Sequence, residues 1–109
     1  MAETMDFFEA VYTQRALRYL KPDPVPDEMI KKIIDAGIHA PNGGNAQGWA
    51  FVVIKDAETK RKMAPLYAGI ARPGNHPPTE TKSQELSEAS GDYLTAHVEE
   101  VPVWILACT

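Results

Sequence analysis

The stretch from residue 40 to residue 54 constrains the fold of this chain most, because its local pattern changes twice within a short span. Pro41 cannot continue a helix, and it biases the preceding residue away from helical dihedral angles. Residues 42–45, Asn-Gly-Gly-Asn, tolerate positive φ angles and predict a tight turn. Residues 49–54 form a nearly continuous apolar run, which is typical of a strand covered on both faces. The stretch therefore predicts a helix end, a polar turn and a buried strand.

The turn places amide side chains beside its glycines. Asn42, Asn45 and Gln47 offer both hydrogen-bond donors and acceptors. The glycines leave room for a flat group to approach the backbone. Two interpretations stay open on the residues alone: an internally hydrogen-bonded turn between helix and strand, or one edge of a cofactor site.

The segment before this turn predicts a helix over about residues 27–39. Apolar side chains recur there at helical spacing: Met29, Ile30, Ile33, Ile34 and Ile38. Gly37 lies in the same stripe, where it favours close packing against another helix.

The remaining pattern predicts three more helices and a second strand. The helices are expected over about 5–13 with Thr4 as N-cap, over about 57–68 after an Asp56 N-cap, and over about 83–98. The apolar run at 103–108 predicts a second buried strand, in which Cys108 is a buried and inert thiol. His76, in the proline-rich loop at 70–81, has no second histidine or cysteine at ligand spacing, so no metal site is predicted.

Composition narrows the class of protein. A hydrophobic content of 44% with 24% charged residues predicts one globular domain over residues 1–109. The net charge of −4 argues against nucleic acid as a partner, and no apolar run is long enough to cross a membrane. A single cysteine and a start without an apolar leader favour a cytoplasmic location. Because the chain stops inside its second strand, we expect it to be truncated.

A second polar motif lies upstream. Arg15 and Arg18, three residues apart after the first helix, present two planar guanidinium groups suited to a phosphate. Taken alone, such a pair is more often solvated surface charge than a binding site.

Both motifs have counterparts in one family of enzymes. Residues 15–26, R-A-L-R-Y-L-K-P-D-P-V-P, and residues 40–49, A-P-N-G-G-N-A-Q-G-W, resemble the R-R-S-x-R-x-F-x-P-D-P-V-P and A-P-S-G-G-N-x-Q-P-W motifs of the nitroreductase family. The resemblance runs over about residues 7–56. It implies an α+β, nitroreductase-like fold with a central mixed sheet flanked by helices, of which this chain is the N-terminal half.

The resemblance also implies FMN as cofactor and assigns residues to it. The phosphate end is expected at Gln14, Arg15, Ala16, Leu17 and Arg18, and the ring edge at Pro41, Asn42, Gly43, Asn45 and Gln47. Two departures from the motifs matter. Ala16 lacks the hydroxyl of the usual serine, and Gly48 replaces a proline that stiffens the turn.

The activity implied is the reduction of nitroaromatics, quinones or similar electrophiles by NAD(P)H in a two-step hydride transfer, within a homodimer. No catalytic side chain and no metal are expected, because the flavin performs the chemistry. Two alternatives stay open: a truncated or vestigial flavin-binding module without turnover, and a protein-interaction domain with no cofactor.

Overall fold

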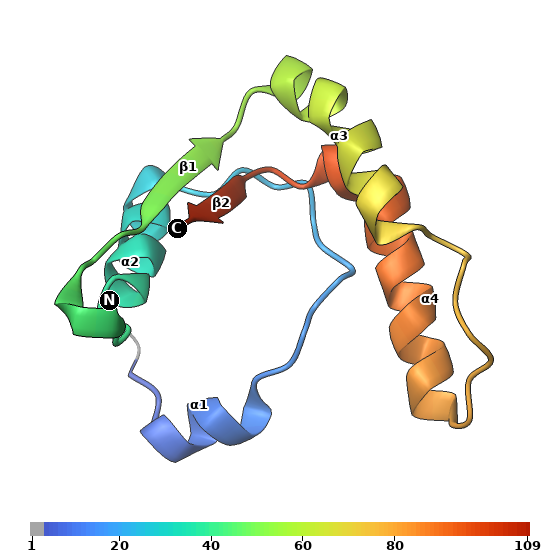
Figure 1. Cartoon of the computed structure of the whole chain (residues 1–109), viewed down its shortest axis with the longest axis horizontal. Coiled ribbons are helices and arrows are strands. Elements are labelled where there is room, and N and C mark those ends of the chain that lie inside the picture. The colour runs from blue at the N-terminus through green and yellow to red at the C-terminus, as the bar shows by residue number, and fades with distance from the viewer. Residues whose placement is uncertain (1–3) are drawn as a thin grey trace.

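The computed structural model describes residues 4–109 and has four α-helices, two short 3-10 helices and two strands. In chain order these are α1 (Phe7–Thr13), α2 (Asp27–Gly37), η1 (Gly43–Asn45), β1 (Ala50–Ile54), α3 (Ala57–Ala71), α4 (Lys82–His97), η2 (Val98–Glu100) and β2 (Trp104–Cys108). Figure 1 shows them arranged around an open ring, with the two strands side by side at its upper edge. The α+β class predicted from the sequence is confirmed.

Side-chain caps mark the start of α1, α3 and α4, whereas α2 begins after Pro26 without one. The Asp56 carboxylate accepts a hydrogen bond from the Thr59 backbone N–H at 2.8 Å, so the predicted cap of α3 is confirmed. The predicted Thr4 cap of α1 is wrong. Asp6 accepts from the Phe8 and Glu9 N–H groups instead, and α1 begins at Phe7. Aspartate is at least as good an N-cap as threonine, and Asp6 stands directly before the apolar helix face.

The sheet is one antiparallel pair that joins distant parts of the chain. Its register runs from Ala50 opposite Cys108 to Ile54 opposite Trp104. The prediction that both strands are buried is wrong. Val52 keeps 46% of its surface exposed, and Cys108, expected as a buried thiol, is exposed. The described helices do not cover both faces of the two-stranded sheet. The apolar sequence of the strands is typical of a sheet that is covered on both faces.

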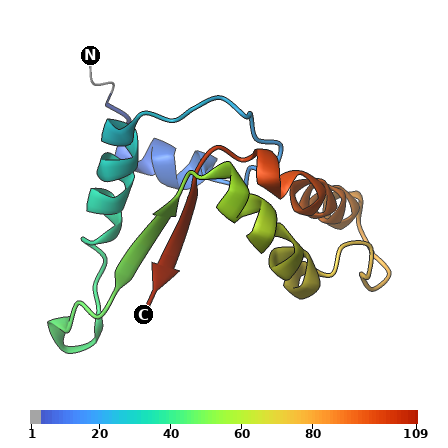
Figure 2. The same cartoon turned by 90° about the horizontal axis from the view of Figure 1, so that it is seen from above.

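At Gly37, helix α2 faces β1. A Cβ placed on Gly37 would lie 3.9 Å from Cζ of Phe51, an ordinary van der Waals distance, so the ring of the strand lies beside the glycine and does not need its missing side chain. The predicted close packing of Gly37 against another helix is therefore wrong, because among the described residues the atom near that Cβ belongs to β1 and lies at an ordinary contact distance. Figure 2 shows α2 beside the strand pair, with α3 and α4 on the opposite side.

The open ring leaves a small core. Among the described residues, the buried apolar side chains are Ile30 and Ile54. The radius of gyration is 16.5 Å, against about 13 Å for a compact chain of this length. The accessible surface is 8990 Å², where about 6,000 Å² is typical for this mass. Large side chains such as Phe7 and Phe8 on α1 are exposed, so much apolar surface is available for further burial. Within residues 4–109 no helix has both the length and the apolarity needed to cross a bilayer.

A buried lysine fixes the entry into β2. The Lys60 ammonium group, on α3, donates to the carbonyl oxygens of Val101 at 3.0 Å and of Pro102 at 3.3 Å. Trp104 adds a bond from its indole N–H to the Val98 carbonyl at 3.1 Å. Because a buried ammonium group without partners is costly, these bonds hold α3 against the segment that leads into the strand.

The loop between α3 and α4 is tied to α4 by one carboxylate. Asp92 accepts from the Gly74 backbone N–H at 3.1 Å and contacts the His76 Nε2 at 2.8 Å. The hydrogen bond to Asp92 raises the pKa of His76 above its ordinary 6.5, and the charges of Asp92 and Glu88 act in the same direction. The hydrogen bond from His76 in turn lowers the pKa of Asp92 below 3.8, with help from Gly74.

These shifts predict a loop that loosens at alkaline pH. The His76 contribution is complete below its unfolded pKa and is lost as pH rises through the raised folded pKa, while the Asp92 contribution is lost only as pH falls through its lowered folded pKa. Amide hydrogen exchange of residues 72–81, corrected for intrinsic rates, should show less protection at about pH 8 than at about pH 5.5. His76→Ala should remove the difference, and His39→Ala should leave it intact. Equal protection at both pH values would contradict the tether.

Candidate functional site

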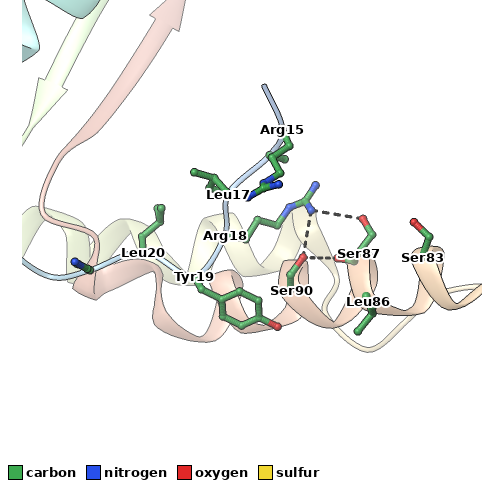
Figure 3. Close-up of a pocket in the computed structure, with 11 residues that line it drawn as sticks. Arg15, Leu17, Arg18, Tyr19, Leu20, Ser83, Leu86, Ser87 and Ser90 are labelled. Atoms are coloured by element: carbon green, nitrogen blue, oxygen red, sulfur yellow. Dashed lines mark hydrogen bonds between the residues drawn. The ribbon is translucent and has the colours of Figure 1, made fainter. Parts of the chain in front are cut away.

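One cavity joins the upstream arginine motif to a face of α4. Its volume is about 720 Å³. Residues from two segments far apart in sequence line it: Arg15, Ala16, Leu17, Arg18, Tyr19, Leu20, Lys21, Ser83, Leu86, Ser87 and Ser90. Figure 3 shows the side chains of Arg15 and Arg18 on the side of the segment that faces α4.

The first segment is extended because helix signals end on either side of it. Gln14 is the C-cap of α1, with its N–H bonded to the Ala10 carbonyl and its own backbone extended. Pro22 follows the segment and disfavours a helical residue before it. Of the five residues predicted at the phosphate end, four line the cavity. Gln14, at the helix end, does not.

Arg18 is held on α4 by two serines. One of its terminal nitrogens, Nη1, donates to Ser90 Oγ at 3.2 Å and lies 3.5 Å from Ser87 Oγ (Figure 3). Ser90 Oγ also donates to the Ser87 backbone carbonyl at 2.8 Å. Since a guanidinium group carries five N–H donors, the half-buried Arg18 keeps donors free for a ligand.

An aromatic contact holds the same segment one residue further along. The rings of Tyr19 and Tyr93 lie 4.7 Å apart between centroids, and the Tyr93 ring stacks on His97 at 4.0 Å. His97 in turn bonds to the Tyr93 carbonyl through Nδ1 at 2.8 Å. The extended segment is thus attached to α4 through both Arg18 and Tyr19.

The charges around the cavity suit an anion. Arg15, Arg18 and Lys21 contribute positive charge, and no carboxylate is among the described residues that line the cavity. The serines of α4 contribute hydroxyl groups to the same cavity that Ala16 lines without one. Cations with neutral hydroxyl donors and no opposing carboxylate form the donor set that a phosphate ester needs.

The second predicted motif forms a self-contained turn. Asn42 Oδ1 accepts from the Gln47 backbone N–H at 2.7 Å, and Asn45 Oδ1 accepts from Gln47 Nε2 at 3.2 Å. Positive φ angles occur at Gly44 (60°), Asn45 (53°) and Gln47 (51°), but not at Gly43. The internally hydrogen-bonded turn, one of the two interpretations of the sequence, is therefore present. Most of its side chains are exposed, and they remain accessible to a ligand.

The structure does not bring the two motifs into one cavity. None of the predicted ring-edge residues, Pro41, Asn42, Gly43, Asn45 and Gln47, lines the cavity at the arginines. In Figure 1 the turn lies beyond the end of α2, and the arginine segment lies across the open ring from it. Residues 4–109 also contain no group of three or more His, Cys, Asp or Glu side chains placed to hold a metal ion.

Sequence reasoning missed the contribution of α4. Ser83, Ser87 and Ser90 share one helix face at spacings of four and three residues, a pattern also typical of a solvated surface. Ser87 and Ser90 lie 69 and 72 residues from Arg18 in the sequence. No local sequence pattern predicts a contact over such a separation.

Comparison with known proteins identifies the same family that the two sequence motifs resemble. The model of the nitroreductase family matches residues 11–108. An NADH dehydrogenase of Thermus thermophilus is 31% identical over 97 residues, which are 89% of this chain and 45% of that protein. Iodotyrosine deiodinase 1 of Rattus norvegicus is 37% identical over 60 residues, 55% of this chain and 21% of that protein. An iodotyrosine deiodinase of Danio rerio is 34% identical over 67 residues, 58% of this chain and 23% of that protein. The chain spans less than half the length of these relatives.

The backbone of the turn predicts that alanine at its two glycines changes the free energy of unfolding by different amounts. Gly44→Ala forces an L-residue into the left-handed region and should lower the free energy of unfolding by about 1 kcal/mol. Gly43→Ala is the matched control, because its φ is not positive and no atom lies within 4 Å of the added Cβ. It should be neutral or stabilising by about 0.5 kcal/mol. Urea unfolding measures both changes, and equal losses would show that the described φ angles are not those in solution.

Proposed function

The chain belongs to the nitroreductase family, and from this membership we propose that it acts as an FMN-dependent oxidoreductase that uses NAD(P)H to reduce nitroaromatics, quinones or similar electrophiles. The observation that carries the proposal is the cavity at Arg15 and Arg18. It unites three cations with hydroxyl donors and has no carboxylate among its described lining residues.

In this proposal the cavity holds the phosphate end of FMN. Arg15 and Arg18 donate charge-assisted hydrogen bonds to phosphate oxygens, and Lys21 adds positive charge nearby. Ala16 and Leu17 lie between the arginines and contribute the wall of the cavity. The donor set fits a phosphate ester, and a volume of about 720 Å³ lies within the range of about 300–1,000 Å³ usual for small-ligand sites.

The turn at 41–47 is proposed to meet the edge of the flavin ring. Its exposed amide groups can bond to the polar edge of the ring, and Gly43 leaves the backbone open to close approach. When bound, FMN supplies the hydride chemistry between nicotinamide and electrophile. The side chains of the chain would bind the cofactor and orient it.

A homodimer is proposed because the two motifs lie apart. The turn contributes nothing to the cavity at the arginines, so a flavin that uses both motifs takes the turn from a second chain. The exposed faces of α1 and β1 provide apolar surface for such an association, with Phe7 70% exposed and Val52 46% exposed.

The alternative is a flavin-binding module without turnover. It predicts FMN binding with no oxidation of NADH or NADPH, whereas the proposed enzyme oxidises one of them when an acceptor is present. A nitroaromatic, a quinone and iodotyrosine are the acceptors to compare, the last because of the deiodinases among the relatives. Absence of FMN binding at millimolar cofactor would reject both readings.

The arginine pair gives the sharpest test of the phosphate site. Replacing Arg15 and Arg18 together with alanine should weaken FMN binding by about 3 kcal/mol, the lower end for two charge-assisted bonds, because Arg15 is exposed. Arg61→Ala is the control, since Arg61 pairs with Glu58 on α3 and does not line the cavity. Titration followed by flavin fluorescence measures the change. Unchanged affinity in the double variant would remove both arginines from the site.

The proposed dimer is tested by measuring the mass of the protein in solution. Sedimentation velocity at micromolar protein should give a species of twice the 12.0 kDa chain mass, because the open fold exposes apolar side chains that association can cover. Phe7→Lys together with Phe8→Lys should weaken association, while Arg61→Ala should not. A monomer over the whole concentration range would contradict the shared site.

A further inference from the structure

We propose that Ser87 and Ser90 are positioning residues for Arg18, which hold its guanidinium group in the orientation that receives the FMN phosphate. This inference rests on the proposed function and deepens it, because neither serine belongs to the two short motifs at residues 15–26 and 40–49. Helix α4 thereby becomes part of the cofactor site without containing any of its expected residues.

The hydrogen-bond directions assign the serines to Arg18. Ser90 donates its hydroxyl proton to the Ser87 carbonyl at 2.8 Å, so the Ser90 oxygen is left as an acceptor. That oxygen receives the Arg18 Nη1–H at 3.2 Å, with Ser87 Oγ at 3.5 Å as a second, weaker acceptor. One terminal nitrogen of the guanidinium group is thus fixed, and the remaining donors stay free (Figure 3).

Fixing one nitrogen matters because arginine is long and flexible. A free side chain loses rotamer entropy when it binds a ligand, and a side chain already ordered in the free protein loses less. The serine contacts order Arg18 in advance, and its planar group then presents its other N–H donors in a fixed direction. The contribution to affinity therefore acts through Arg18 and not through direct contact of the serines with phosphate.

The surrounding contacts allow this role to be tested without loss of the cavity. Tyr19 remains attached to Tyr93 when the serines are changed, so the extended segment keeps its place on α4. Thr81 and Gln84 cap the start of α4 reciprocally, and neither lines the cavity. Alanine is also a better helix former than serine, so the helix should tolerate the substitutions.

The first experiment compares FMN with riboflavin, which lacks the phosphate. Replacing Ser87 and Ser90 together with alanine should weaken FMN binding by about tenfold. Riboflavin binding should change by less than about twofold, whereas a general loss of structure weakens both ligands alike. Threonine at both positions keeps the hydroxyl groups and should restore most of the FMN affinity.

The second experiment is a thermodynamic cycle. In an Arg18→Ala background, the same two serine-to-alanine changes should have no further effect on FMN binding, because the serines act through the missing arginine. An additional tenfold loss in that background would overturn the positioning role and indicate direct contact between serine and phosphate. An unchanged ratio of FMN to riboflavin affinity in the double serine variant would also overturn it.

The affinities of the wild-type chain for FMN and for riboflavin distinguish a failure of the serine inference from a failure of the proposed function. If the wild type prefers FMN to riboflavin and the cycle shows no coupling, only the role of the serines is wrong. If the wild type shows no preference for FMN, the phosphate site itself is wrong and the inference falls with it.

Discussion

The antiparallel ladder between β1 and β2 is the interaction on which the rest of the structure depends. It joins the part that contains α2 and the turn to the part that contains α3 and α4. A lone two-stranded sheet is marginally stable in water, so the ladder needs support from its ends. Lys60 gives that support by holding the Val101 and Pro102 carbonyls, and Trp104 anchors the first residue of β2 to Val98. The position at which β2 begins is thus fixed by both the buried ammonium group of Lys60 and the indole of Trp104.

A second connection crosses the ring where the extended segment meets α4. Arg18 and Tyr19 make it, through serine hydroxyls and an aromatic contact respectively. The two contacts differ in what they provide. The aromatic pair keeps the main chain in place, and the serines set the direction of a cation. Because the structural contact and the contact to the cation are separate, the orientation of Arg18 can change without loss of the contact that holds the main chain, and a site of this kind depends on such supporting contacts.

Local signals in the sequence predicted the elements, and tertiary contacts decided the rest. The apolar period and the Asp56 cap placed α2 and α3 within a few residues, because both signals lie within or directly beside the helix that they predict. Burial of the strands was predicted wrongly, since an apolar run shows only that a surface can be covered, not what covers it. The arginine motif predicted most of one wall of the cavity. The opposite wall at Ser87 and Ser90 could not be predicted, because helix periodicity carries no information about a partner some seventy residues away.

The open fold and the divided site have one common consequence under the proposed function. If the arginines of one chain and the turn of another hold the same flavin, every cofactor contact at the turn is also a contact between chains. Cofactor binding and association are then thermodynamically linked, so each strengthens the other by the same factor. The exposed apolar side chains of α1 and of the sheet supply the favourable term for association, and the arginines supply selectivity for a phosphate ester. An isolated chain has one half of the site well ordered, because α4 holds it, and presents the other half on an exposed turn held only by its own hydrogen bonds. The order already present at Arg18 therefore matters most in the unassociated chain, where no partner is available to orient the cofactor.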